Sequence, residues 1–173
     1  RNEGPRAPRR RVVDGPRGKL LTFVVHHIAH YPIRMRGTFC GSLAHSDPSS
    51  EWCLTAATLG ASMLAKSARG ERTLAARDFF DWAMPTNLKD DELLAEVRLP
   101  LLAADTCFGF YEFSRRAGDY AIAAALVTYR LAGGVIADPH VGVGGAEGRP
   151  RRIAEAEAAL AGQPPSIEGF RKA

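Results

Sequence analysis

The pattern of hydrophobic and polar residues divides the first third of the chain into two helices separated by a loop. Residues 20–31 (LLTFVVHHIAHY) are apolar over most of a helical surface, which predicts a buried helix. Residues 32–42 contain a proline and two glycines, and we expect a loop there. Asp47 and the proline after it are a typical helix start, so a second helix is expected to run to Leu59, where a glycine follows.

Shorter segments bounded by turn residues follow and predict β-strands. The expected strands are residues 62–66, 72–75, 92–99, 108–115, 122–130 and 135–143. A hairpin turn at Gly133 and Gly134 joins the last two strands. Short helices are expected at residues 77–84 and 151–160. The elements together predict an α+β fold that ends in a three-stranded antiparallel sheet covered by the last helix.

Composition changes this picture only at the beginning of the chain. Residues 1–19 contain seven Lys or Arg and two Asp or Glu, which gives this segment a net charge of +5. The whole chain has a net charge of +4, so the remaining residues carry −1. Because this segment is rich in proline and poor in apolar residues, we expect a disordered or foreign leader. A nucleic-acid arm is the less favoured alternative, since no aromatic residue interleaves with the arginines. No apolar run approaches the ~20 residues of a membrane span.

The cysteines and histidines do not predict a metal site. Cys40, Cys53 and Cys107 are widely spaced, without a Cys-x-x-Cys pair, and reduced thiols in a cytoplasmic protein are the simplest interpretation. Any iron–sulfur cluster therefore belongs to another polypeptide. His26 and His30 lie one helical turn apart, but the glutamate of a His-Glu-x-x-His site is missing, so packed or surface histidines are favoured.

One glycine-bearing segment has the composition of a ligand-binding turn. Residues 37–42 (GTFCGS) combine two glycines, which allow close approach of the backbone, with hydroxyl donors at Thr38 and Ser42. Successive amides in such a turn form an anion-binding nest suited to a diphosphate. Taken alone, a turn of this composition is more often plain structure.

The surrounding residues favour the ligand interpretation. Residues 33–48 (IRMRGTFCGSLAHSDP) resemble the FAD-binding medium subunit of the molybdenum hydroxylases, the family of carbon monoxide, xanthine, nicotine-type and caffeine dehydrogenases. Its pattern is approximately I-R-N-R-G-T-x-G-G-S/N-x-A-H-x-D-P-x-x-E/D. Further matches occur in order at residues 77–80, 91–94, 115–121, 142–145 and 150–152. The resemblance extends from about residue 20 to residue 162.

The resemblance implies a fold and a FAD site. Residues 20–104 would be the second subdomain, and thus the middle part, of a PCMH-type FAD-binding domain. Residues 105–173 would be an incomplete C-terminal domain of the medium subunit. The FAD contacts implied are with Thr38, Phe39, Cys40, Gly41 and Ser42 at the diphosphate, Asp47 and Glu51 at the ribityl or adenosine hydroxyls, Leu94 at the adenine, and Tyr120 beside the isoalloxazine ring. The residues alone allow an interpretation without a ligand for each of the last four. Asp47 is equally explained as a helix N-cap and Glu51 as a favourable partner of the helix dipole. Leu94 could be a core residue, and Tyr120 an ordinary aromatic residue of the sheet.

The implied function is electron transfer within a cytoplasmic oxidoreductase complex. Electrons would pass from [2Fe-2S] clusters in a small iron–sulfur subunit through FAD to an external acceptor, while a large subunit holds molybdopterin and oxidises the substrate. No residue of this chain would be catalytic, so it would not be competent alone.

Departures from the family pattern leave a second hypothesis open. Cys40 stands where many members of the family have glycine, and Met35 replaces the usual asparagine. Glu112 stands where a number of relatives carry a lysine near the flavin. Nothing before Leu20 resembles the first FAD loop, A-G-G-x-S-L, which predicts an N-terminally truncated member. The alternative function is therefore a non-enzymatic remnant or interaction module that no longer holds FAD.

Overall fold

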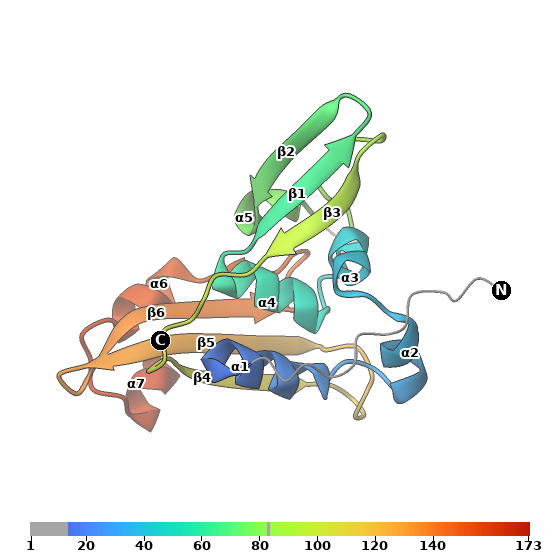
Figure 1. The fold of residues 1–173 in the computed structure, drawn as a ribbon. Helices are drawn as coiled ribbons and strands as arrows, with labels where there is room; N and C mark the ends of the chain where they lie inside the picture. The colour runs from blue at the N-terminus through green and yellow to red at the C-terminus, as the bar shows by residue number, and fades with distance from the viewer. Residues whose placement is uncertain (1–13, 83) are drawn as a thin grey trace.

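The computed structural model describes residues 14–82 and 84–173, which form two antiparallel sheets with a helix between them (Figure 1). The helices are α1 (Gly15–Val25), α2 (Tyr31–Arg36), α3 (Phe39–His45), α4 (Glu51–Leu59), α5 (Ala76–Phe79), α6 (Ala154–Leu160) and α7 (Ile167–Lys172). The strands are β1 (Ser62–Ser67), β2 (Gly70–Ala75), β3 (Leu93–Arg98), β4 (Cys107–Phe113), β5 (Ala123–Ala132), β6 (Val135–Gly144) and β7 (Arg151–Arg152). The predicted α+β class is confirmed.

The first sheet has the order β2-β1-β3 and packs one face against α3, α4 and α5. Met63 in the central strand pairs with Leu74 on one side and Val97 on the other. Its side chain is buried in a core with Leu43 of α3 and Phe79 of α5. This core fixes α3 beside β3.

The second sheet has the order β4-β5-β6-β7 and carries α4 and α1 on one face. Leu20 and Val24 of α1 are buried together with Leu54 of α4 and Leu126 of β5. Gly142 in β6 allows α4 to lie against the strand, because an added Cβ would overlap Thr58 Oγ1. Helix α4 thus belongs to both cores and joins the two sheets.

The observed beginning of α1 corrects part of the predicted leader. Residues 1–13 lie outside the described residues, whereas residues 15–19 form the first turns of α1. A proline in the first turn starts the helix, Gly18 is buried, and Arg17 donates a hydrogen bond to Leu99 O at 3.1 Å. The disordered segment predicted for residues 1–19 is therefore wrong from residue 15 onward.

Four further details of local structure differ from the predictions. The loop expected at residues 32–42 contains most of α2 and the first turn of α3, because Pro32 lies in the first turn of a helix and Thr38 caps the next one. Helix α4 is capped by Ser50, so it begins three residues later than expected from Asp47. The helix expected at 77–84 ends at Phe79. The C-terminal sheet has a short fourth strand, β7, in addition to the three expected.

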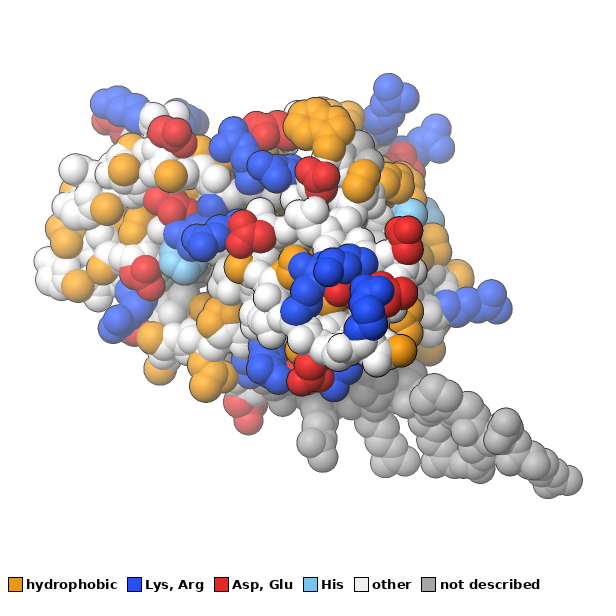
Figure 2. Space-filling model, turned by 90° about the horizontal axis from the view of Figure 1, so that it is seen from above, with side chains coloured by type: hydrophobic (Ala, Val, Ile, Leu, Met, Phe, Trp, Pro, Cys, Tyr) orange, Lys and Arg blue, Asp and Glu red, His pale blue; other side chains and the backbone are white. Residues whose placement is uncertain are grey.

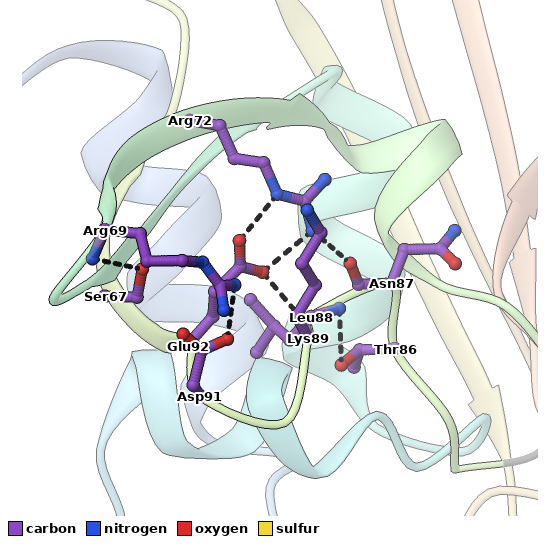
Figure 3. A network of polar contacts seen from close by, with 9 residues as sticks. All are labelled: Ser67, Arg69, Arg72, Thr86, Asn87, Leu88, Lys89, Asp91 and Glu92. Carbon is purple, nitrogen blue, oxygen red and sulfur yellow. Dashed lines mark hydrogen bonds and ion pairs between the residues drawn. The ribbon is translucent and has the colours of Figure 1, made fainter.

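A network of polar contacts attaches the segment before β3 to the β1–β2 hairpin (Figure 3). Arg72 binds the Glu92 carboxylate through two hydrogen bonds, both 2.8 Å long. The Lys89 amide donates a third hydrogen bond to Glu92, also 2.8 Å long. The Arg72 guanidinium, and after it the Lys89 amide, lower the pKa of Glu92 to about 2. The network fixes where β3 begins, and with it the position of Leu94.

Charged side chains of both signs are interspersed on the face that contains this sheet, seen from above in Figure 2. Lys66 pairs with Glu71 at 2.8 Å and Arg98 with Glu96 at 2.7 Å on the side of the sheet away from the core. That face therefore lacks the extended basic surface typical of nucleic-acid binding. Among residues 14–82 and 84–173, no helix is both long and apolar enough to cross a membrane.

Candidate functional site

A cavity of about 260 Å³ lies where the start of α4 faces the segment that precedes β5. One wall is the turn between α3 and α4, and the opposite wall is the segment 118–120. The connection between α1 and α2 closes a third side. The lining residues are Ile28, Ala29, Ile33, Ser42, His45, Asp47, Ser49, Ser50, Glu51, Gly118, Asp119 and Tyr120.

Short polar side chains hold the α3–α4 turn in shape. Asp47 Oδ1 accepts a hydrogen bond from the Ser49 amide at 2.8 Å, so the carboxylate is fixed within the turn at the cavity wall. Ser42 Oγ lies 2.8 Å from Ser50 Oγ, and Ser50 also caps α4 by accepting from the Cys53 amide at 3.4 Å. The wall therefore presents hydroxyl and carboxylate groups that are already oriented.

Glu51 is the most deeply placed charged residue of the cavity. Its residue surface is only 9% exposed, and burial raises the pKa of its carboxyl from 4.5 to about 7. The hydrogen bond from its own amide acts in the opposite direction, while the negative charges of Glu112 and Asp47 add to the increase. Near neutral pH this carboxyl therefore exists in both forms and can either donate or accept a hydrogen bond with a ligand hydroxyl.

The opposite wall is a tight turn whose backbone requires glycine. Gly118 has φ +87°, and an added Cβ would lie 2.6 Å from the His30 ring. The Asp119 amide donates to Arg116 O at 3.0 Å, which closes the turn. Tyr120 follows before β5 begins and is 75% exposed, so it stands at the rim of the cavity and is not a packed residue of the sheet.

The structure brings together four of the nine residues predicted for the FAD site. Ser42, Asp47, Glu51 and Tyr120 all line the cavity, although Tyr120 comes from the other half of the chain. The contact of each with FAD stays a prediction. The remaining five residues, Thr38, Phe39, Cys40, Gly41 and Leu94, lie outside the lining of the cavity.

The segment 38–41 is the start of α3 and not an open loop. Thr38 Oγ1 accepts a hydrogen bond from the Gly41 amide at 3.0 Å, so one amide of the expected nest already has a partner. The Phe39 ring packs edge-on against Trp52 at 5.0 Å between ring centroids. Burial, and to a lesser extent the charge of Glu96 in β3, raises the pKa of Cys40.

Leu94 belongs to the structural part of the site. It lies half-buried on β3 and packs against the core that contains Leu43 of α3. Leu94 therefore contributes to the core through which β3 packs against α3.

The other lining residues have only weak signals in the sequence. Ser49 and Ser50 occupy the variable positions of the Asp-Pro-x-x-Glu pattern, and Ser50 also has the composition of an N-cap. The contributions of Ile28 and Ala29 depend on the path between α1 and α2, which the sequence pattern did not reveal. In the described part of the chain, no group of three His, Cys, Asp or Glu side chains is arranged to hold a metal ion.

The charges of the cavity decide which part of a ligand fits. Its lining contains the carboxylates of Asp47, Glu51 and Asp119 and one imidazole, His45, but neither lysine nor arginine. Carboxylates accept hydrogen bonds from hydroxyl groups well and repel phosphate. The cavity therefore suits an uncharged, hydroxyl-bearing segment of a cofactor, together with an aromatic ring at Tyr120.

Comparison with known families identifies the family of the chain. Residues 15–102 match the FAD binding domain in molybdopterin dehydrogenase, and residues 108–173 match the CO dehydrogenase flavoprotein C-terminal domain. The chain belongs to this FAD-binding family of the molybdenum hydroxylases. The prediction drawn from the motif at residues 33–48 is confirmed, as is FAD as the cofactor of the family.

Individual relatives show the same relationship. The nicotine 6-hydroxylase medium subunit of Paenarthrobacter nicotinovorans is 38% identical over 95% of this chain and 59% of its own length. The caffeine dehydrogenase subunit beta of Pseudomonas sp. (strain CBB1) is 40% identical over 62% of this chain and 37% of its own. The chain thus spans about half the length of the curated relatives that it matches.

Solved structures share the fold. Quinoline 2-oxidoreductase from Pseudomonas putida 86 superposes with a TM-score of 0.82 and 34% identity, covering 87% of this chain and 52% of that one. Carbon monoxide dehydrogenase from Hydrogenophaga pseudoflava superposes with a TM-score of 0.79 and 31% identity, covering 83% and 50%.

Proposed function

We propose that this chain forms part of the FAD-binding electron-transfer subunit of a molybdenum-containing dehydrogenase. Electrons would pass from iron–sulfur clusters of a small subunit through FAD to an external acceptor, while a large molybdenum subunit oxidises the substrate. The observation that carries the proposal is the cavity, because Asp47, Glu51 and Tyr120 come together there from two distant parts of the family pattern. When bound, FAD supplies the redox chemistry at its isoalloxazine ring.

The residues present fit a division of FAD between two regions. Ser42, Asp47 and Glu51 would bind hydroxyl groups of the cofactor, and the exposed ring of Tyr120 would lie beside the isoalloxazine. The diphosphate would lie outside the acidic cavity at the start of α3, residues 38–41, with Leu94 supporting the adenine end from β3. This chain therefore contributes binding, orientation and electrostatics, and no residue of it acts on the organic substrate.

Under this function the chain would divide at residue 104. Residues 20–104 would be a subdomain of the FAD-binding domain, and residues 105–173 part of the C-terminal domain that delivers Tyr120. The two parts meet at the cavity, where the Ser49 hydroxyl donates a hydrogen bond to Ala121 O at 2.9 Å. Both parts are consequently needed for the site.

Titration of the purified protein with FAD tests the proposal. We expect saturable quenching of flavin fluorescence, weakened by Glu51→Ala and by Tyr120→Ala. Tyr111→Ala is the matched control, because Tyr111 is 73% exposed, close to the 75% of Tyr120, yet lies on β4 away from the cavity. Wild-type protein without saturable FAD binding would overturn the proposal and favour the interaction module that holds no flavin.

A further inference from the structure

Three segments that are far apart in the sequence meet beside the cavity. Ser49 in the α3–α4 turn donates its hydroxyl to Ala121 O at 2.9 Å. The Gly145 amide, just after β6, donates to Pro48 O at 2.8 Å. The α3–α4 turn is thus held by the C-terminal half of the chain at two neighbouring points.

The Ser49 hydrogen bond acts on the residue next to Tyr120. Because the Tyr120 ring is 75% exposed, its position depends mainly on the backbone that carries it. Ala121 is buried, and after it the Ile122 amide donates to Phe113 O at 2.8 Å. Among the described residues, the Ser49 hydroxyl makes the side-chain hydrogen bond that joins the turn 47–50 to the segment 118–121.

Ser49 also orients the wall of the cavity that carries Asp47. The Ser49 amide donates to Asp47 Oδ1 at 2.8 Å, so the backbone of Ser49 holds a cavity carboxylate while its side chain holds the Tyr120 segment. Gly145 leaves room for this contact. It has φ +78°, and an added Cβ would lie 2.9 Å from Ala121 O.

We propose that Ser49 is a positioning residue that sets the distance between Tyr120 and the acidic wall of the cavity. Under the proposed function, on which this inference rests, Ser49 places the Tyr120 ring against the flavin without touching the reacting atoms. A short side chain with a single hydroxyl donor suits the role, since it reaches a backbone carbonyl and loses little rotamer freedom.

A merely structural role for Ser49 predicts a different result. In that case Ser49→Ala lowers stability and leaves the Tyr120 segment and the ligand unaffected. Ser46→Ala is the matched control, because Ser46 also donates its hydroxyl to the carbonyl of a distant segment, Pro85 O, at 3.3 Å. Ser46 lies three residues away in the same turn, but neither Ser46 nor its partner Pro85 lines the cavity.

The first measurement needs no ligand. Amide hydrogen exchange is followed in the peptide that covers residues 116–122 of the wild type, Ser49→Ala, Ser49→Thr and Ser46→Ala. We expect exchange to become about tenfold faster in Ser49→Ala, normal exchange in Ser49→Thr, and no change in Ser46→Ala. Equal exchange of this peptide in Ser49→Ala and Ser46→Ala would overturn the inference, whether or not the protein binds FAD.

The second measurement uses FAD and a double-mutant cycle. Ser49→Ala should weaken FAD binding about fivefold and reduce quenching of the flavin, and Ser49→Thr should restore both. In a Tyr120→Leu background the same substitution should have no further effect, because its action passes through Tyr120. Full additivity of the two substitutions would overturn the inference. Failure of the wild type to bind FAD would refute the proposed function alone, since hydrogen exchange still decides the role of Ser49.

Discussion

Replacing Glu51 with glutamine should make the protein more stable, and increasingly so as the pH rises. The substitution keeps the size of the side chain and removes a carboxyl that burial deprives of water. Because the pKa of Glu51 is raised from 4.5 to about 7, the folded state favours the protonated form. The wild type therefore has its full stability below pH 4.5 and loses part of it as the pH rises towards 7, whereas glutamine stays neutral throughout.

The pKa difference sets the size of the effect. Each pKa step corresponds to about 1.4 kcal/mol, so the interval between 4.5 and about 7 gives a loss of at most about 3 kcal/mol in the wild type. For a chain of this length, that free energy corresponds to a difference in melting temperature on the order of 5 to 10 °C. The advantage of Glu51→Gln should be small at pH 4.5 and reach its maximum above pH 7.

Thermal and urea denaturation of both proteins between pH 4.5 and pH 8 measure this advantage. Glu155→Gln on the exposed face of α6 serves as the control. The stability difference between this variant and the wild type should not show the same dependence on pH. A Glu51→Gln variant whose stability relative to the wild type is constant over this range would refute the reasoning, because the carboxyl would then not be desolvated.

Three other substitutions test the packing and polar contacts of the fold. Gly142→Ala should lower the free energy of unfolding by about 2 kcal/mol, because the new Cβ overlaps Thr58 Oγ1. Adding Thr58→Ala should restore part of that free energy in urea denaturation. If the two substitutions lower the free energy of unfolding additively, the overlap is contradicted. Glu92→Gln should lower the melting temperature clearly at pH 7, and the deficit should shrink as the pH falls from 4.5 towards 2, since the Arg72 contact keeps the native carboxyl ionised. A deficit of equal size at pH 3 and pH 7 would contradict that assignment. Thr38→Ala should cost about 1 kcal/mol of unfolding free energy through loss of the α3 cap, and a Thr38→Ser variant as unstable as Thr38→Ala would argue against the cap.

The strands were predictable because their signals are local. Alternation and turn residues placed β1, β2, β5 and β6 within a few residues of their observed bounds, and Gly133 and Gly134 both have the positive φ of their hairpin turn. The helices α2 and α3 are not evident from the sequence, because proline and glycine usually indicate a loop. Pro32 instead lies in the first turn of α2. The Thr38 side chain caps α3 by accepting a hydrogen bond from the amide of Gly41.

The candidate site was predictable only in part, since its two walls come from distant segments. The family pattern indicated Asp47 and Glu51 on one side and Tyr120 on the other, but gave no reason for them to face one cavity. The reason is tertiary: α4 packs on β6 through Gly142, which brings the turn before α4 to the beginning of β5. Ser49, which then bonds to Ala121, has no signal of its own in the sequence.

Charge explains why the cavity and the start of α3 should serve different parts of one cofactor. A phosphate in the cavity would lie beside Asp47 and Asp119, and each unit charge at about 4 Å opposes it by about 1 to 4 kcal/mol, depending on solvent exposure. The negative charge of Glu112 adds to the field at Glu51. Hydroxyl groups meet no such repulsion, and one that donates to Glu51 would favour the ionised carboxylate and lower its pKa. Binding of FAD in the proposed orientation should therefore reduce the stability advantage of Glu51→Gln at pH 8, whereas a phosphate in the cavity would increase it.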